Sequence, residues 1–149
     1  MEKINETKPV INGLEWDTKN VTFEEKTLLD WNKSKGIKEG DWRLPTNEEL
    51  AALAALGSTW DEENQGRWFG PDSELLSDSK KSVFLPADGF RNPDCSMGGR
   101  GYSGYYWSAS PYDRLNAYYL NFNSNRVYPV DADDRTHGFS VRLVKDLQK

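Results

Sequence analysis

The only histidine of the sequence, His137, follows a run of acidic residues that could assist it in acid–base chemistry. Asp131, Asp133 and Asp134 precede it, so a hydrolytic site would pair the imidazole with one of these carboxylates. No persuasive nucleophile lies nearby, and an isolated histidine beside a glycine is typical of a surface. We therefore expect no enzyme and no catalytic residue; an enzyme that uses His137 is the least favoured of three interpretations.

The same acidic run resembles part of a calcium-binding loop. Asp131-x-Asp133-Asp134 has the alternating carboxylates with which an EF-hand loop begins. Its fifth position is Arg135 and its twelfth is Arg142, where such a loop needs an oxygen ligand and a bidentate glutamate. The sequence excludes an EF-hand, leaves a looser calcium site open against a solvated acidic turn, and predicts that folding requires no metal.

Two other features could carry chemistry but favour plain structural roles. Cys95 is the only cysteine, which excludes a disulfide within the chain and a cysteine-based zinc site. The string Gly99-x-Gly101-x-x-Gly104 matches a dinucleotide-binding fingerprint, but it leads into an aromatic strand instead of a helix. We interpret these glycines as a tight loop and expect no cofactor.

Length and charge limit the classes of protein and partner. The 149 residues suit one domain, residues 1–149, and 13% aromatic residues indicate a folded core although only 36% are hydrophobic. A net charge of -5 argues against nucleic acid as a partner. Residues 1–8 lack the apolar run of a secretory signal, and no apolar stretch is long enough to insert into a membrane, so we expect a soluble chain. Compartment and oligomeric state stay open.

Two capping-box patterns predict helices in the N-terminal half. Thr22-Phe-Glu-Glu25 predicts a helix over residues 23–34. Thr46-Asn-Glu-Glu49 predicts a second helix, with leucines at three-residue spacing, that ends before Gly57.

Strands are expected mainly in the C-terminal third, after a loop-rich stretch over residues 57–106. The expected strands are residues 13–16, 83–85, 105–110, 118–123, 126–130 and 139–143. Early helices followed by an antiparallel sheet predict an α+β fold. Alternation in the sheet predicts one face in the core and one facing solvent. The core-facing residues would be Tyr118, Leu120, Phe122, Val127 and Val130, and the outward residues Tyr119, Asn121, Asn123, Tyr128, Asp131 and Asp133.

The residue types change abruptly between Ser108 and Val144. Lys, Glu, Gln, Met and Trp are frequent elsewhere but absent from this segment, a gap that independent placement would produce on the order of once in ten thousand sequences. A codon that ends in a pyrimidine encodes none of these five, whereas changes to the adenines of an asparagine codon yield the Asn, Asp, Tyr, Ser, Arg and His that are abundant here. The competing interpretation is that strands and turns disfavour Lys and Glu.

Several motifs resemble a known family, the Fibrobacter succinogenes major paralogous domain. They are Trp42-Arg-Leu-Pro-Thr46, Leu85-Pro-Ala-Asp-Gly-Phe-Arg91, Gly104-Tyr-Tyr-Trp-Ser-Ala-Ser110, Asn116-Ala-Tyr-Tyr-Leu-Asn-Phe-Asn123 and Gly138-Phe-Ser-Val-Arg142. The resemblance covers nearly the whole chain from about Gly13 and implies a C-type lectin-like fold. Within it, residues 108–144 closely resemble the variable segment of diversity-generating retroelement proteins, in which reverse transcription randomises adenines to diversify a binding surface.

Two other functions of that fold are excluded by missing residues. The Glu-Pro-Asn or Gln-Pro-Asp and Trp-Asn-Asp motifs of calcium-dependent sugar binders are absent, and one cysteine cannot supply the cysteine pair of formylglycine-generating oxidases.

We therefore expect a non-enzymatic, calcium-independent protein of bacterial or phage origin that binds a protein or cell-surface ligand. Tyr112, Tyr119 and Tyr128 would anchor the ligand. The alternative is an undiversified surface or structural module of the same family. The expected ligand-binding residues are Tyr112, Asp113, Arg114, Asn116, Tyr119, Asn121, Asn123, Asn125, Arg126, Tyr128, Asp131, Asp133, Asp134 and His137.

Overall fold

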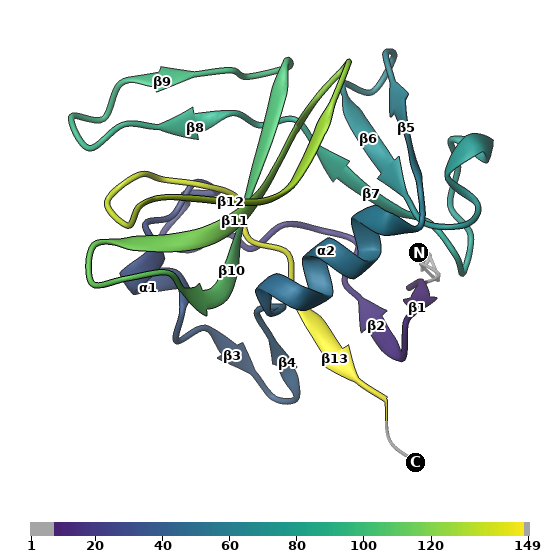
Figure 1. Cartoon of the computed structure of the whole chain (residues 1–149), viewed down its shortest axis with the longest axis horizontal. Coiled ribbons are helices and arrows are strands. Elements are labelled where there is room, and N and C mark those ends of the chain that lie inside the picture. Colours follow the sequence, from purple (N-terminus) through teal and green to yellow (C-terminus); the bar gives the residue numbers. More distant parts are fainter. Residues whose placement is uncertain (1–7, 148–149) are drawn as a thin grey trace.

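A computed structural model describes residues 8–147 and shows a mostly β architecture (Figure 1). The helical elements are α1 (Trp31–Ser34), α2 (Asn47–Ala55) and the 3-10 turn η1 (Ser73–Leu75). The strands are β1 (Val10–Ile11), β2 (Leu14–Trp16), β3 (Lys38–Glu39), β4 (Trp42–Arg43), β5 (Ser58–Asp61), β6 (Gly66–Phe69), β7 (Val83–Pro86), β8 (Phe90–Arg91), β9 (Met97–Gly98), β10 (Ser103–Pro111), β11 (Asn116–Asn123), β12 (Val127–Asp134) and β13 (Val144–Asp146).

The strands form small antiparallel sheets. Their orders are β1-β2-β13-β4-β3, β5-β6-β7, β8-β9 and β10-β11-β12. The first of these joins both ends of the described chain, because β13 lies between β2 and β4. The sheet β10-β11-β12 has the longest strands, and α2 packs against all three of them (Figure 1).

The predicted α+β class, with two helices near the N-terminal half and a C-type lectin-like fold, is wrong for this structure. Among residues 8–147, α2 is the only helix longer than four residues, and strands in four sheets make up most of the regular structure. The predicted strands at residues 13–16 and 83–85 are confirmed as β2 and β7.

The second predicted helix is confirmed as α2, and its capping box is formed. The Glu49 amide donates to the Thr46 hydroxyl at 3.1 Å, and the Thr46 amide donates to the Glu49 carboxylate at 2.9 Å. Leu50 and Leu53 are buried on the side of the helix that faces the core. Two reciprocal hydrogen bonds and a leucine stripe therefore agree on one local structure.

The first predicted helix is wrong, because residues 22–25 enter a tight turn. Phe23 and Lys26 exchange both backbone hydrogen bonds, and Glu24 and Glu25 between them adopt φ values of 52° and 67°. Leu28 and Leu29 are both buried, and Leu29 exchanges backbone bonds with Phe139. This extended, doubly buried pair cannot lie on one helical face, so the helix shrinks to α1.

Replacing Glu24 by Asn and Glu25 by Gly should raise the free energy of unfolding by about 1 kcal/mol. Two successive positive φ values are the backbone of a type I′ turn, which Asn-Gly adopts with less strain than two glutamates. Urea unfolding measures the change. The matched control, Glu24→Ala with Glu25→Ala, removes the same charges but keeps both Cβ atoms; equal stabilisation by the control would contradict the strain argument.

The sheet β10-β11-β12 lies between two hydrophobic clusters. Tyr106, Leu120 and Phe122, with even numbers, belong to one cluster together with Leu50 and Leu53 of α2. Odd-numbered residues of the same strands belong to the other cluster: Trp107, Ala117 and Tyr119, packed with Leu29, Trp31 and Phe139. Successive side chains of a strand point to opposite faces, so each face of the sheet covers part of the core.

The prediction of one core face and one solvent face is therefore wrong. Tyr119, expected to point outward, is only 6% exposed, and Val130, expected in the core, is 49% exposed. A register shift between β11 and β12 places one residue, Leu120, opposite two, Pro129 and Val130. Such a bulge re-aims the side chains that follow it.

The prediction of a strand with alternating burial at residues 139–143 is wrong. These residues are all buried and pair only through isolated bridges at Phe139 and Ser140, after which β13 begins at Val144.

Candidate recognition surface

The expected ligand-binding residues differ in exposure. Tyr119 is buried, and the other expected residues reach solvent to some degree. The exposed ones are Tyr112, Asp113, Arg114, Asn125, Arg126, Tyr128 and Asp131. The half-buried ones are Asn116, Asn121, Asn123, Asp133, Asp134 and His137.

The structure separates this set into three groups. Residues 112–116 form the turn between β10 and β11, and residues 123–126 form the turn between β11 and β12. These turns lie at opposite ends of the eight-residue strand β11, about 25 Å apart by strand geometry (Figure 1). The third group lies in a central strip on the face of the sheet that carries the odd-numbered residues of β10 and β11. There Asn121 has Tyr128 as its neighbour on β12 and Tyr105, which is not one of the expected residues, as its neighbour on β10.

The central strip rests on stacked aromatic rings. Tyr105 has ring-centroid distances of 5.8 Å to Tyr119, 5.1 Å to Phe139 and 5.3 Å to Phe90 of β8. Phe139 also packs 4.7 Å from Tyr119 and 6.0 Å from the His137 ring. This network fixes the rings before any ligand arrives, which lowers the entropic cost of binding to them.

Carboxylates border these rings and give the strip its chemistry. The Tyr119 hydroxyl donates to Asp131 at 3.3 Å, and Asp133 lies 3.8 Å from His137 Nδ1. Burial, followed by the charges of Asp131 and Asp133, raises the pKa of Tyr119. Burial also raises the pKa of Tyr105, with smaller contributions from the same carboxylates, so both phenols stay protonated at neutral pH. The strip offers acceptors and negative charge, which suit a ligand with N–H donors or a cation.

An arginine holds the turn at residues 112–116 by its backbone. Arg135 donates from Nε to the Asn116 carbonyl at 3.1 Å and from Nη2 to the Asp113 carbonyl. Its guanidinium lies 4.3 Å over the Trp31 ring, which fixes its orientation. The turn is thus held through main-chain carbonyls, which every residue type supplies.

A second arginine holds the turn at residues 123–126 in the same way. Arg67 of β6 donates to the Asn123 carbonyl at 2.9 Å and to the Ser124 carbonyl at 3.2 Å, and its Nη1 donates to Ser58 Oγ at 2.9 Å. It is only 7% exposed, and burial lowers its pKa. We call Arg67 and Arg135 the two arginine clamps.

Several expected variable side chains also stabilise their own turns. Asp113 accepts the amides of Leu115 and Asn116, and Asn123 accepts those of Asn125 and Arg126. Such side-chain caps are met by Asp, Asn, Ser or Thr and not by most other residues. The exposed positions without such a role, Tyr112, Arg114 and Asn125 among them, have the greatest freedom.

The acidic run, Asp131 to Asp134, forms the C-terminal half of β12 and not an isolated turn. Asp134 uses its carboxylate to accept the amide and hydroxyl of Thr136. Of the carboxylates considered as partners for His137, Asp133 is the one within 4 Å of its ring nitrogen. Within residues 8–147, no group of three or more His, Cys, Asp or Glu side chains is placed to hold a metal ion.

Two aromatic residues, Tyr105 of the central strip and Phe90 beside it, are not among the expected ligand-binding residues. Tyr105 precedes the segment with unusual composition, and Phe90 comes from another sheet. The alternation of Tyr105 with Trp107 could have placed Tyr105 on the odd-numbered face, since it pairs with Asn121. Nothing in the sequence indicates that β8 packs there.

A family model described as "Domain of unknown function (DUF8237)" matches residues 72–144, just under half of the chain. The matched region contains both turns and the central strip but omits Arg67 and α2. No curated protein and no solved structure matches the chain. In the part of the chain that the structure describes, no helix has the length and apolar character needed to cross a membrane.

Proposed function

We propose that this chain is a non-enzymatic ligand-binding protein whose segment 108–144 is diversified, as in the variable proteins of diversity-generating retroelements. One observation carries the proposal: the stretch that lacks Lys, Glu, Gln, Met and Trp coincides with two turns and a strip that reach solvent. A general effect of β structure explains this less well, because Lys and Glu occur in β2, β3 and β13.

The backbone support of the turns is the second argument for diversification. Both arginine clamps bind carbonyl oxygens, so a change of side chain at Arg114 or Asn125 leaves their hydrogen bonds in place. A surface of this kind can change its chemistry while its shape is kept, which is what a diversified binder requires.

The ligand is a protein or a cell-surface molecule that presents hydrogen-bond donors or positive charge. Tyr112, 57% exposed, supplies an amphipathic ring in the turn at residues 112–116, and Tyr128, 37% exposed, supplies one in the central strip. Asp131 and Asp133 supply acceptors between them. Tyr119 supports the ligand-binding residues and does not contact the ligand itself, since its ring is buried and its hydroxyl positions Asp131. Its variation is therefore restricted.

The coding DNA tests the proposal most directly. We expect a near-copy of the segment encoding residues 108–144 beside a reverse-transcriptase gene, with differences confined to adenines of the copy. These differences should fall at codons for exposed residues, such as Tyr112, Arg114 and Asn125, and should spare Leu120 and Phe122. A locus without the copy and the reverse transcriptase would contradict diversification and favour the undiversified module.

A further inference from the structure

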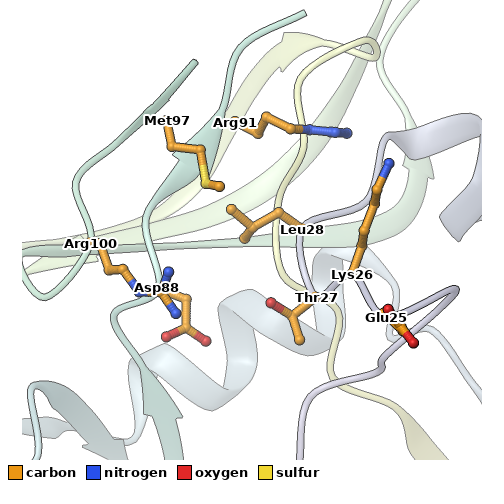
Figure 2. A pocket seen from close by; sticks show the side chains of 8 residues that line it. All are labelled: Glu25, Lys26, Thr27, Leu28, Asp88, Arg91, Met97 and Arg100. Atoms are coloured by element: carbon orange, nitrogen blue, oxygen red, sulfur yellow. The ribbon is translucent and has the colours of Figure 1, made fainter. Parts of the chain in front are cut away.

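A pocket of about 280 Å³ lies outside segment 108–144, between the turn at residues 23–26 and the β8-β9 hairpin (Figure 2). Three basic residues, Lys26, Arg91 and Arg100, contribute to its wall. Leu28 and Met97 form an apolar part between them. The volume is close to the lower end of the range for small-molecule sites.

The basic side chains of this pocket lack partners within the described chain. Arg43, Arg67, Arg135 and Arg142 all donate to carboxylates or carbonyls, whereas no hydrogen bond or ion pair joins the side chains of Lys26, Arg91 or Arg100 to another residue of 8–147. Two carboxylates, Glu25 and Asp88, also line the pocket, so its charge is positive by one. An anion would supply the missing acceptors.

Arg91 is held in place by packing and not by an acceptor. Its guanidinium lies against Gly138, where an added Cβ would come within 2.8 Å of Nη2 and 3.0 Å of Nε. The Nε atom is buried without a hydrogen-bond partner, which is destabilising for a charged donor. In Figure 2 the guanidinium points toward the ammonium of Lys26, so the two positive groups converge on one part of the pocket.

The apolar wall distinguishes this pocket from a site for a bare ion. Met97 is 63% exposed, and Leu28 lies between the Lys26–Arg91 end and the Asp88–Arg100 end in Figure 2. The turn at residues 23–26 is closed by two backbone hydrogen bonds, which fix the backbone position from which the Lys26 side chain extends. A ligand with an oxyanion and a short apolar body matches both parts of the wall.

We propose that this pocket binds a small organic oxyanion, with Lys26 and Arg91 contacting the anionic group and Leu28 and Met97 contacting the apolar body. Phe90, the neighbour of Arg91, faces Tyr105 of the central strip. Since successive strand residues point to opposite faces, β8 separates this pocket from the central strip. The site is therefore a second one, whose residues the diversified segment does not include.

Titration of the ¹⁵N-labelled protein with hexanoate, inorganic phosphate and hexylammonium, at constant ionic strength, tests the proposal by NMR. Hexanoate should shift the Arg91 Nε–H and Lys26 backbone resonances with saturation. Inorganic phosphate should bind at least about fivefold more weakly, because it lacks the apolar body, and hexylammonium should not shift these resonances. Absence of saturation with hexanoate, equal binding of phosphate, or the same shifts with hexylammonium would overturn it.

Two variants assign the contacts. Arg91→Gln and Lys26→Gln should each weaken hexanoate binding about tenfold, and Lys33→Gln, an exposed lysine of α1, should leave it within twofold. If Arg91→Gln does not fold, as judged by circular dichroism, Lys26→Gln decides, because Lys26 is exposed. Unchanged affinity in Lys26→Gln would overturn the proposal.

Discussion

Replacing Tyr119 by alanine should lower the free energy of unfolding by about 3 kcal/mol or more. The ring is 6% exposed and packs against Tyr105, Trp107 and Phe139, so its removal leaves a cavity beneath the central strip. The hydroxyl also donates to Asp131, which would lose this hydrogen bond and keep the one from the Ala132 amide.

Tyr112→Ala is the matched control for Tyr119→Ala. It removes the same side chain from a position that is 57% exposed and should change stability by about 0.5 kcal/mol or less. Urea unfolding of both variants, monitored by fluorescence, measures the difference. If both variants lose little and equally in free energy of unfolding, Tyr119 is not part of the core and does not support the central strip.

The sequence predicts local elements well where several independent signals agree. In α2, a hydroxyl–glutamate capping pair and three leucines at helical spacing favour the same structure, and the helix forms. At Thr22 the capping pattern is accompanied by Gly36 at the expected C-terminal cap but by a less regular apolar set, Phe23, Leu28 and Trp31. There, the burial of Leu28 and Leu29 and the bridge to Phe139 favour an extended chain, and tertiary contacts override the local signal.

Composition identifies the segment that we propose for recognition, residues 108–144, but it could not predict which face of its sheet is buried. The alternation of residues along a strand shows which side chains share a face of the sheet. It does not show whether another segment of the chain packs on the second face. Phe139 covers part of the odd-numbered face of β10-β11-β12, because its ring packs against Tyr105, Trp107 and Tyr119. The next residue, Ser140, accepts from the Trp107 amide and donates to the Tyr105 carbonyl, which holds the segment beside β10. Tyr119 therefore becomes buried although Asn121 and Asn123, the next residues of β11 on the same face, are polar.

The arginine clamps could not be predicted from sequence at all. Arg67 lies 56 residues before Asn123, and it reaches a carbonyl oxygen, which carries no residue-specific signal. The function of such a clamp is likewise independent of the side chains that it supports. Because the clamp binds main-chain carbonyl oxygens, sequence analysis cannot detect it. For the same reason it can hold a turn whose side chains vary.

Replacing Arg67 by alanine should lower the free energy of unfolding by about 3 kcal/mol and loosen the turn at residues 123–126. The change removes donors to Ser58, Asn123 and Ser124 in a buried place, so three acceptors lose their partner. Arg67→Lys keeps the charge but not the fork of donors, so it should recover only part of the loss.

Hydrogen exchange distinguishes a clamp from a general contribution to stability. In Arg67→Lys, the amides of Asn125 and Arg126, which bond to the Asn123 side chain, should exchange faster relative to wild type than the amides of α2 do. Arg126→Ala serves as the control: within residues 8–147 the side chain of this exposed arginine bonds only to Tyr128, so its removal should leave the exchange of Asn125 unchanged. A uniform increase across α2 and the turn would indicate that Arg67 stabilises the whole fold without holding the turn. If the turn loosens selectively, its side chains are carried by a backbone that the scaffold fixes, as diversification of residues 108–144 requires.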